Sequence, residues 1–465
     1  MSPIRPEGLI ARLRSRLLGS QLRANIASGL GANIVSVLVA AAAYPIYLHY
    51  LGYEQYGLWL VLSTVMVMAQ LGNLGISPAL LKLVAEDFAL GDIAGVYRYV
   101  STAILGLAVT GLLFSAALLL FRRPVVGLFA LQGANYTLVY SLLPYAALLS
   151  VYVLVIDAFN CTLAGLGRYD LVSYTQVAGQ AITFLVAVLF LHFGVGVWSL
   201  FYGSAASLVF LNVITFYLIR RITGSAVPLR LRWDRERFLR ILHLGSWVFG
   251  GNLINMVLTP LNRLFVARYV GVAAVPAYDI AYLAGMKIRA FLESGFRALT
   301  PEFSSLRVTS AEMVQERLAT TDRKGSKVVL YGGTALYCGV FVLAGWALHL
   351  WLGARFTPQL PGAFRILLVG TYASLWSVQP YYTLLGFGRS RQILIVQLIT
   401  AALNIAYVYG QPWLFHQPIS LTTILVGTSL GMVGSAVYLR WQASRLRLDI
   451  ANATEPMLQT TTKIL

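Results

Sequence analysis

The chain has 465 residues, of which 58% are hydrophobic and only 11% are charged, and its mean hydropathy is +0.73. Soluble domains carry about 25% charged residues, so this composition excludes a soluble enzyme and indicates a polytopic membrane protein. Lys and Arg outnumber Asp and Glu by 35 to 17, an excess that in a membrane protein is typical of cytoplasmic loops and that does not by itself indicate nucleic acid binding.

The first 25 residues carry leucines at every fourth position, Leu9, Leu13 and Leu17, with arginines between them. This spacing predicts a basic amphipathic helix on the cytoplasmic leaflet. A disordered basic tail remains the alternative.

Apolar runs of about 20 residues, each long enough to cross a bilayer, follow along the chain. We therefore predict an all-α polytopic membrane protein with about twelve transmembrane helices. The predicted helices are residues 26–50, 56–76, 99–121, 138–163, 171–193, 196–219, 242–268, 273–299, 327–350, 362–385, 392–410 and 420–440.

The distribution of Lys and Arg predicts the orientation of these helices. With the N-terminus in the cytoplasm, 26 basic residues fall on the inner side, and only Arg122, Arg123 and Arg355 fall on the outer side. This asymmetry predicts that both termini are cytoplasmic. The outer loops are short, which argues against a membrane glycan polymerase or ligase, because such an enzyme would need a sizeable outer segment.

The chain contains an internal repeat. Residues 162–168 (TLAGLGR) return as 383–389 (TLLGFGR) at an offset of 221, and 50–52 (YLG) return as 269–271 (YVG) at an offset of 219. These offsets predict a duplicated six-helix unit, with two parallel bundles around a central cleft, as in alternating-access transporters. The predicted divisions are an N-terminal segment (1–25), two bundles (26–219 and 242–440), a basic linker (220–241) and a cytoplasmic tail (441–465).

Ionisable residues inside a predicted span are costly and indicate function. The first half has Asp157, whereas the second half has eight: Arg263, Arg268, Asp279, Lys287, Arg289, Glu293 and Arg297, and also Arg365 early in the tenth predicted span. In the repeat, Arg263 corresponds to Tyr44 and Arg289 to Gln70. The fold therefore does not require these charges.

One face of the predicted eighth helix is polar, because steps of three or four join Asp279, Tyr282, Met286, Arg289, Glu293 and Arg297. A face of this kind should line the cleft and bind an anion, since the planar fork of Arg suits phosphate. We expect Arg263, Arg289 and Arg297 to hold this anion, with Lys287 and Arg268 as second choices. The alternative is that Glu293 merely pairs with Arg289 and Arg297 at i,i+4 spacing.

Three carboxylates, Asp157, Asp279 and Glu293, are candidates for coupling to a proton or sodium ion. The alternatives are a hydrogen-bonded helix contact for Asp157 and a salt bridge to Arg263 or Lys287 for Asp279. Two cysteines and five scattered histidines show no metal-ligand spacing, and no glycine-rich lysine loop for ATP occurs. The sequence therefore predicts no cofactor, no metal and no enzyme activity.

The stretch 44–57 (YPIYLHYLGYEQYG), with 74–76 (LGI), 85–86 (AE), 91–92 (GD) and 164–168 (AGLGR), resembles the polysaccharide biosynthesis flippases. These are the O-antigen and exopolysaccharide lipid-linked oligosaccharide translocases of the multidrug/oligosaccharidyl-lipid/polysaccharide (MOP) exporter superfamily. The resemblance covers nearly the whole chain and implies two six-helix bundles that rock between inward-open and outward-open states.

The resemblance further implies that the protein flips an undecaprenyl-diphosphate-linked glycan, such as an O-antigen, capsule or exopolysaccharide unit destined for lipopolysaccharide or the cell surface. The bacterial inner membrane would be its location, and membrane lipids, the polysaccharide polymerase and the export machinery would be its partners. The sequence departs from the multidrug exporters, because its first helix has no acidic residue between Ile26 and Tyr50. An ion-coupled drug or metabolite exporter on the same fold remains an alternative, and it would favour carboxylates in the cleft.

Overall fold

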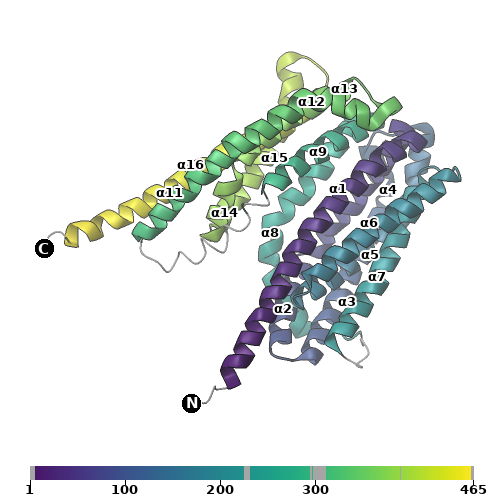
Figure 1. The fold of residues 1–465 in the computed structure, drawn as a ribbon. Coiled ribbons are helices and arrows are strands. Elements are labelled where there is room, and N and C mark those ends of the chain that lie inside the picture. Colours follow the sequence, from purple (N-terminus) through teal and green to yellow (C-terminus); the bar gives the residue numbers. More distant parts are fainter. Residues whose placement is uncertain (1–5, 225–230, 294–295, 297–310, 388, 462–465) are drawn as a thin grey trace. The chain divides into compact units, whose positions relative to one another are not determined.

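The computed structural model describes residues 6–224, 231–293, 296, 311–387 and 389–461 (Figure 1). No strand occurs in these ranges, so the predicted all-α class is confirmed. The chain divides into two compact units, Met1–Gly250 and Gly251–Leu465, each of which is described by itself.

Unit 1 is a bundle of long helices in which α6 packs against α1 and α7, and α3 packs against α5. Its elements are α1 (Pro6–Met68), η1 (Ala69–Asn73), α2 (Ile76–Ala89), α3 (Ile93–Leu120), α4 (Arg122–Leu128), α5 (Gly133–Gly165), α6 (Tyr169–His192), α7 (Trp198–Thr223) and the first part of α8 (Arg235–Phe265).

Unit 2 contains the end of α8 and a second set of helices, in which α16 packs against α15 and α13, and α9 packs against α13. Its further elements are η2 (Val266–Val270), η3 (Val272–Ala274), α9 (Val275–Glu293), α11 (Ala311–Lys327), η6 (Val328–Gly333), α12 (Thr334–Leu352), η7 (Gly353–Arg355), α13 (Gln359–Leu375), α14 (Val378–Gly386), α15 (Ser390–Phe415) and α16 (Leu421–Thr461).

Eight helical segments within the described ranges are long and apolar enough to cross a membrane. The first, Gly31–Asn73, covers two predicted spans, because 43 residues of helix rise about 65 Å, roughly twice the hydrocarbon thickness. The predicted spans 242–268, 273–299 and 362–385 overlap α8, α9 and the pair α13 and α14, respectively, but these helices are not among the eight. Four charged residues interrupt α9, and a break after Leu375 separates α13 from α14.

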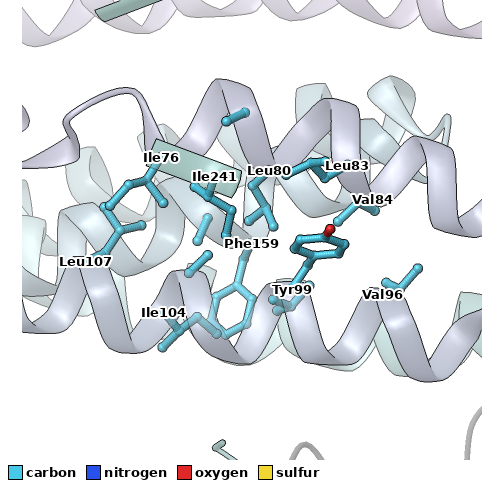
Figure 2. Packing of buried hydrophobic residues seen from close by; sticks show 14 of the residues in the cluster. Ile76, Leu80, Leu83, Val84, Val96, Tyr99, Ile104, Leu107, Phe159 and Ile241 are labelled. Atoms are coloured by element: carbon cyan, nitrogen blue, oxygen red, sulfur yellow. The ribbon is translucent and has the colours of Figure 1, made fainter. Parts of the chain in front are cut away.

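A hydrophobic core in unit 1 joins α2, α3, α5 and the start of α8 (Figure 2). From α2 it takes Ile76, Leu80 and Leu83, which recur at helical spacing and are at most 2% exposed. Phe159 of α5 and Ile241 of α8 close the cluster. The first turns of α8 are therefore part of the unit 1 core.

Polar contacts hold the same end of α8 to unit 1. Arg237 forms a 3.3 Å ion pair with Asp87, and its guanidinium lies 4.3 Å from the ring centroid of Tyr99. The backbone N–H of Arg232 donates to the hydroxyl of Ser101 at 2.6 Å. The range 220–241 was predicted as a linker, but both of its ends are helical. The helix α7 continues to Thr223, and α8 begins at Arg235.

The predicted repeat is confirmed at the turn where its longest motif lies. Both α5 and α14 end at offset 221, and the N–H of Arg168 bonds the carbonyl of Leu163 at 3.0 Å, just as that of Arg389 bonds Leu384 at 2.9 Å. The glycines of the shorter motif, Gly52 and Gly271, both have positive φ, +68° and +116°. A side chain would strain this backbone, so glycine breaks the helix at the same place in each half.

The described residues nearest to the two ends of the chain are helical. Residues 6–25, predicted as a separate amphipathic segment, are continuous with the first span in α1. Likewise, α16 runs on to Thr461 through the range predicted as a tail. Whether either end lies on the membrane surface stays a prediction.

Candidate functional site

A buried ion pair joins α8 to α9 in unit 2. The guanidinium of Arg263 donates to Asp279 Oδ1 through both Nε, at 2.8 Å, and Nη2. The Asp279 side chain is 1% exposed and that of Arg263 is 13% exposed. Asp279 therefore adopts the salt bridge that the sequence left as its alternative, with Arg263 rather than Lys287 as the partner.

A second charged group lies further along α9, near its C-terminal end. Arg289 Nη2 is 3.5 Å from Glu293 Oε2, and the Tyr382 hydroxyl of α14 donates to Glu293 Oε1 at 2.8 Å. The Nε of Arg289 is buried and has no hydrogen-bond partner among the described residues. Glu293 thus has two partners, whereas the Arg289 fork keeps an unused donor.

The predicted cations do not form one cluster. Asp279 and Arg289 are ten residues apart on α9, which is about 15 Å along the axis. Lys287 is exposed on another face of α9, and Arg268 is exposed beside the ring of Tyr269. Arg297 lies outside the described residues.

A buried polar cluster includes Asn262, the residue before Arg263, and the sequence did not predict it. Asn404 of α15 donates to Asn262 Oδ1 at 3.0 Å, and Asn262 donates to Thr428 of α16 at 3.2 Å. Tyr278, the residue before Asp279, is 0% exposed. Isolated Asn and Thr residues in apolar runs carry no periodic signal, so only the packing of α8, α15 and α16 identifies them.

Asp157 lies in the C-terminal third of α5 and contacts the bend between η1 and α2. Asn73 donates from Nδ2 to Asp157 Oδ2 at 2.9 Å and to the Ser77 hydroxyl at 2.8 Å. No ion pair to Asp157 occurs within the part of the chain that the structure describes. The hydrogen-bonded helix contact that the sequence left as the alternative for Asp157 is present. The Asp157 carboxylate accepts from an amide, whereas the Asp279 carboxylate accepts from a guanidinium.

The turn that carries the repeat motif differs in charge between the two halves. Arg168 donates from Nε and Nη2 to the two carboxylate oxygens of Asp170 at 2.9 and 2.8 Å. These hydrogen bonds raise the pKa of the Arg168 guanidinium above its ordinary value. Position 391 of the second half is Arg where the first half has Asp170, so this bidentate pair cannot form there.

Within the described ranges, no group of three or more His, Cys, Asp and Glu side chains is placed to hold a metal ion. Unit 2 instead contains two guanidinium groups at the candidate site. That of Arg263 is paired with Asp279, and that of Arg289 has a donor without a partner among the described residues. Such groups suit a phosphate or carboxylate ligand.

The fold is that of a known class of membrane proteins. The chain is similar to the inward-facing structure of a multidrug resistance MATE family transporter of the MOP superfamily. The identity is 15%, 89% of this chain and 95% of the other are covered, and the TM-score is 0.75. The corresponding outward-facing structure is 16% identical, with 93% and 96% covered and a TM-score of 0.61. A MATE structure in complex with MaD5 is 16% identical, with 94% and 97% covered and a TM-score of 0.63.

These similarities show that the chain has a MATE-like fold, and with its candidate spans it is a multi-pass membrane protein, as the sequence predicts. No curated protein matches the chain. Residues 50–361 match the family described as polysaccharide biosynthesis protein, which is more than half of the chain. The protein belongs to this family.

Proposed function

We propose that this protein is a MOP-type transporter that flips a polyprenyl-diphosphate-linked oligosaccharide from the cytoplasmic to the periplasmic leaflet of the bacterial inner membrane. Family membership links the chain to polysaccharide biosynthesis, and the MATE-like fold favours transport over catalysis. The observation that carries the proposal is the buried Nε of Arg289 in α9, a guanidinium donor that has no partner among the described residues and is left for an anionic head group.

Lipid mass spectrometry on cells depleted of the protein tests this function. We expect polyprenyl-diphosphate oligosaccharide to accumulate in the cytoplasmic leaflet, and the accumulated lipid would identify the glycan. Intact surface polysaccharide without accumulation would contradict the flippase and favour a drug or metabolite exporter. Accumulation of single units on the periplasmic side would instead favour a polymerase or ligase.

Replacing Arg289 by alanine is expected to lower the flipping rate by about ten- to hundred-fold, because one charge-assisted hydrogen bond to the head group, worth roughly 1.5–3 kcal/mol, is lost. Surface glycan per molecule of protein is the measurement. Arg289→Lys keeps the charge but not the planar fork and should fall between wild type and alanine. An Arg289→Ala variant that expresses stably and exports glycan at the wild-type rate would remove Arg289 from the site.

We further propose that Asp157 couples flipping to a proton or sodium gradient. Asp157→Asn keeps the side-chain volume and an oxygen that accepts from Asn73, but it loses the charge. Flipping into vesicles should therefore lose its dependence on an imposed gradient while the protein folds normally. Ser77→Ala is the matched control, since it removes a neighbouring hydroxyl and leaves the carboxylate. Gradient dependence that survives in Asp157→Asn would contradict this role.

A further inference from the structure

An apolar cavity of about 220 Å³ lies between α12 and α13 of unit 2. Its lining residues are Thr334, Tyr337, Cys338, Phe341, Val342, Leu368, Val369 and Tyr372. Val342 and Val369 are among the most exposed apolar residues of these helices, at 72% and 57%. The cavity is therefore an open groove rather than a sealed void, and its α12 side belongs to the candidate membrane span Leu318–Arg355.

The two ends of the groove differ in chemistry. At one end the hydroxyls of Thr334 and Tyr372 are 2.7 Å apart and bond each other. At the other end Arg365, one turn before Leu368 on α13, donates from Nε to the Phe341 carbonyl at 3.1 Å. Its guanidinium carbon is 5.4 Å from the centroid of the Phe341 ring. The groove is thus apolar along its length and has a cation at one end.

The Arg365 guanidinium is available for an anion. Its Nε is used by a carbonyl, and no carboxylate pairs with it among the residues the structure describes. On the predicted topology, α13 descends from the outer side, so Arg365 lies toward the periplasmic leaflet. A guanidinium at that depth can reach the head-group region by extending along the surface.

The size and shape of the groove indicate what fills it. Pockets that enclose a drug-sized molecule measure about 300–1,000 Å³, whereas an apolar cavity of ~150 Å³ holds one benzene ring. The groove therefore suits a short stretch of one hydrocarbon chain. Its walls are uneven, with the aromatic rings of Tyr337, Phe341 and Tyr372 against β-branched valines. Such walls fit a methyl-branched isoprenoid chain better than a straight acyl chain.

We propose that the groove between α12 and α13 binds a polyprenyl diphosphate lipid in the periplasmic leaflet, with its isoprenoid chain in the groove and its diphosphate on Arg365. This inference rests on the proposed function, since the flipped product is such a lipid. The site holds the lipid after translocation and is separate from the arginines of α8 and α9.

The groove contains its own reporter, because Cys338 is an exposed thiol that lines it. In full-length protein with Cys161 replaced by alanine, Cys338 is the remaining cysteine. The rate of maleimide labelling is measured in nanodiscs of uncharged lipid with added undecaprenyl diphosphate. At nine times the dissociation constant, occupancy is about 90% and the rate should fall about ten-fold.

Matched lipids and variants decide between selective and general binding. Undecaprenol, which lacks the diphosphate, and phosphatidylglycerol, which lacks the isoprenoid chain, should slow labelling less than two-fold. Arg365→Ala should abolish the protection by the diphosphate lipid. Arg355→Ala, which removes an outer cation outside the groove lining, should retain it.

If all three lipids protect Cys338 equally, or if none protects it, the proposal is wrong. This comparison of lipids does not depend on the folding of the Arg365 variant. Maleimide labelling does not require transport. It therefore tests the binding of lipid in the groove separately from the proposed flippase function. Protection of Cys338 with no glycan lipid accumulating in depleted cells would refute the flippase only. Accumulation without protection would refute the groove only.

Discussion

Replacing Arg263 by alanine is expected to destabilise the protein by about 3–5 kcal/mol, because the carboxylate of Asp279 would stay buried without its counter-ion. Asp279 is 1% exposed, so water cannot replace the guanidinium without opening the contact between α8 and α9. Thermal unfolding of purified protein in detergent measures the loss.

The double variant Arg263→Met/Asp279→Leu separates stability from binding. Removing both charges of a buried pair is often neutral or stabilising, so this variant should unfold close to the wild-type temperature. Slow flipping by the stable double variant would support Arg263 as a ligand for the head group, whereas normal flipping would restrict the pair to a structural role. Arg268→Ala, which removes an exposed cation five residues away, should change stability little. Wild-type stability of the single variant Arg263→Ala would contradict the prediction.

Replacing Gly75 by alanine is the second change for which we expect a large effect. Gly75 has a φ of +78°, and a Cβ there would lie 2.1 Å from the carbonyl oxygen of Gly245 in α8. Backbone strain of about 1–3 kcal/mol adds to an overpacking cost of about 1–3 kcal/mol. We expect a marked loss of folded protein, measured by size-exclusion profile and thermal unfolding.

Gly91→Ala is the matched control for this prediction. Gly91 has nearly the same φ, +74°, but a Cβ there would meet nothing within 4 Å. It should therefore cost only the conformational strain of about 1–2 kcal/mol. Gly245→Ala, whose Cβ would lie 2.5 Å from the carbonyl oxygen of Gly75, should show the overpacking cost without the backbone strain. Equal losses at Gly75 and Gly91 would show that strain, and not the close approach of α8, limits Gly75.

Local features of the sequence account for much of the fold. Apolar runs of the right length predicted helices that the structure contains, since hydropathy follows directly from composition. The repeated motif predicted the turn after Gly165 and its counterpart after Gly386, because capping depends on a few neighbouring residues. Helix ends were less accurate, as the start of α8 at Arg235 shows, because contacts with Asp87 and Tyr99 extend the helix into the predicted linker.

The candidate site was predicted only in part. Helical spacing identified the charged face of α9, but it could not decide which partners the charges take. The choice of Arg263 over Lys287 for Asp279, and the bond from Tyr382 to Glu293, depend on helices 16 and 89 residues away along the chain. No pattern in the sequence marked Asn262, Asn404 and Thr428 as a site. Each is a single polar residue in an apolar run, and they form a cluster only because three helices pack together.

The sequence by itself determined the class of the protein, the repeat and the surplus of cations in the second half, because composition, periodicity and charge are properties of the chain alone. Tertiary structure decided which charges are neutralised and which remain available. A guanidinium that packs beside a carboxylate is neutralised by it, whereas one that keeps an unused donor can bind an anionic ligand. Arg263 is held by Asp279, whereas Arg289 and Arg365 keep donors for a ligand. The distinction arises from how helices pack, and no spacing along the chain encodes it.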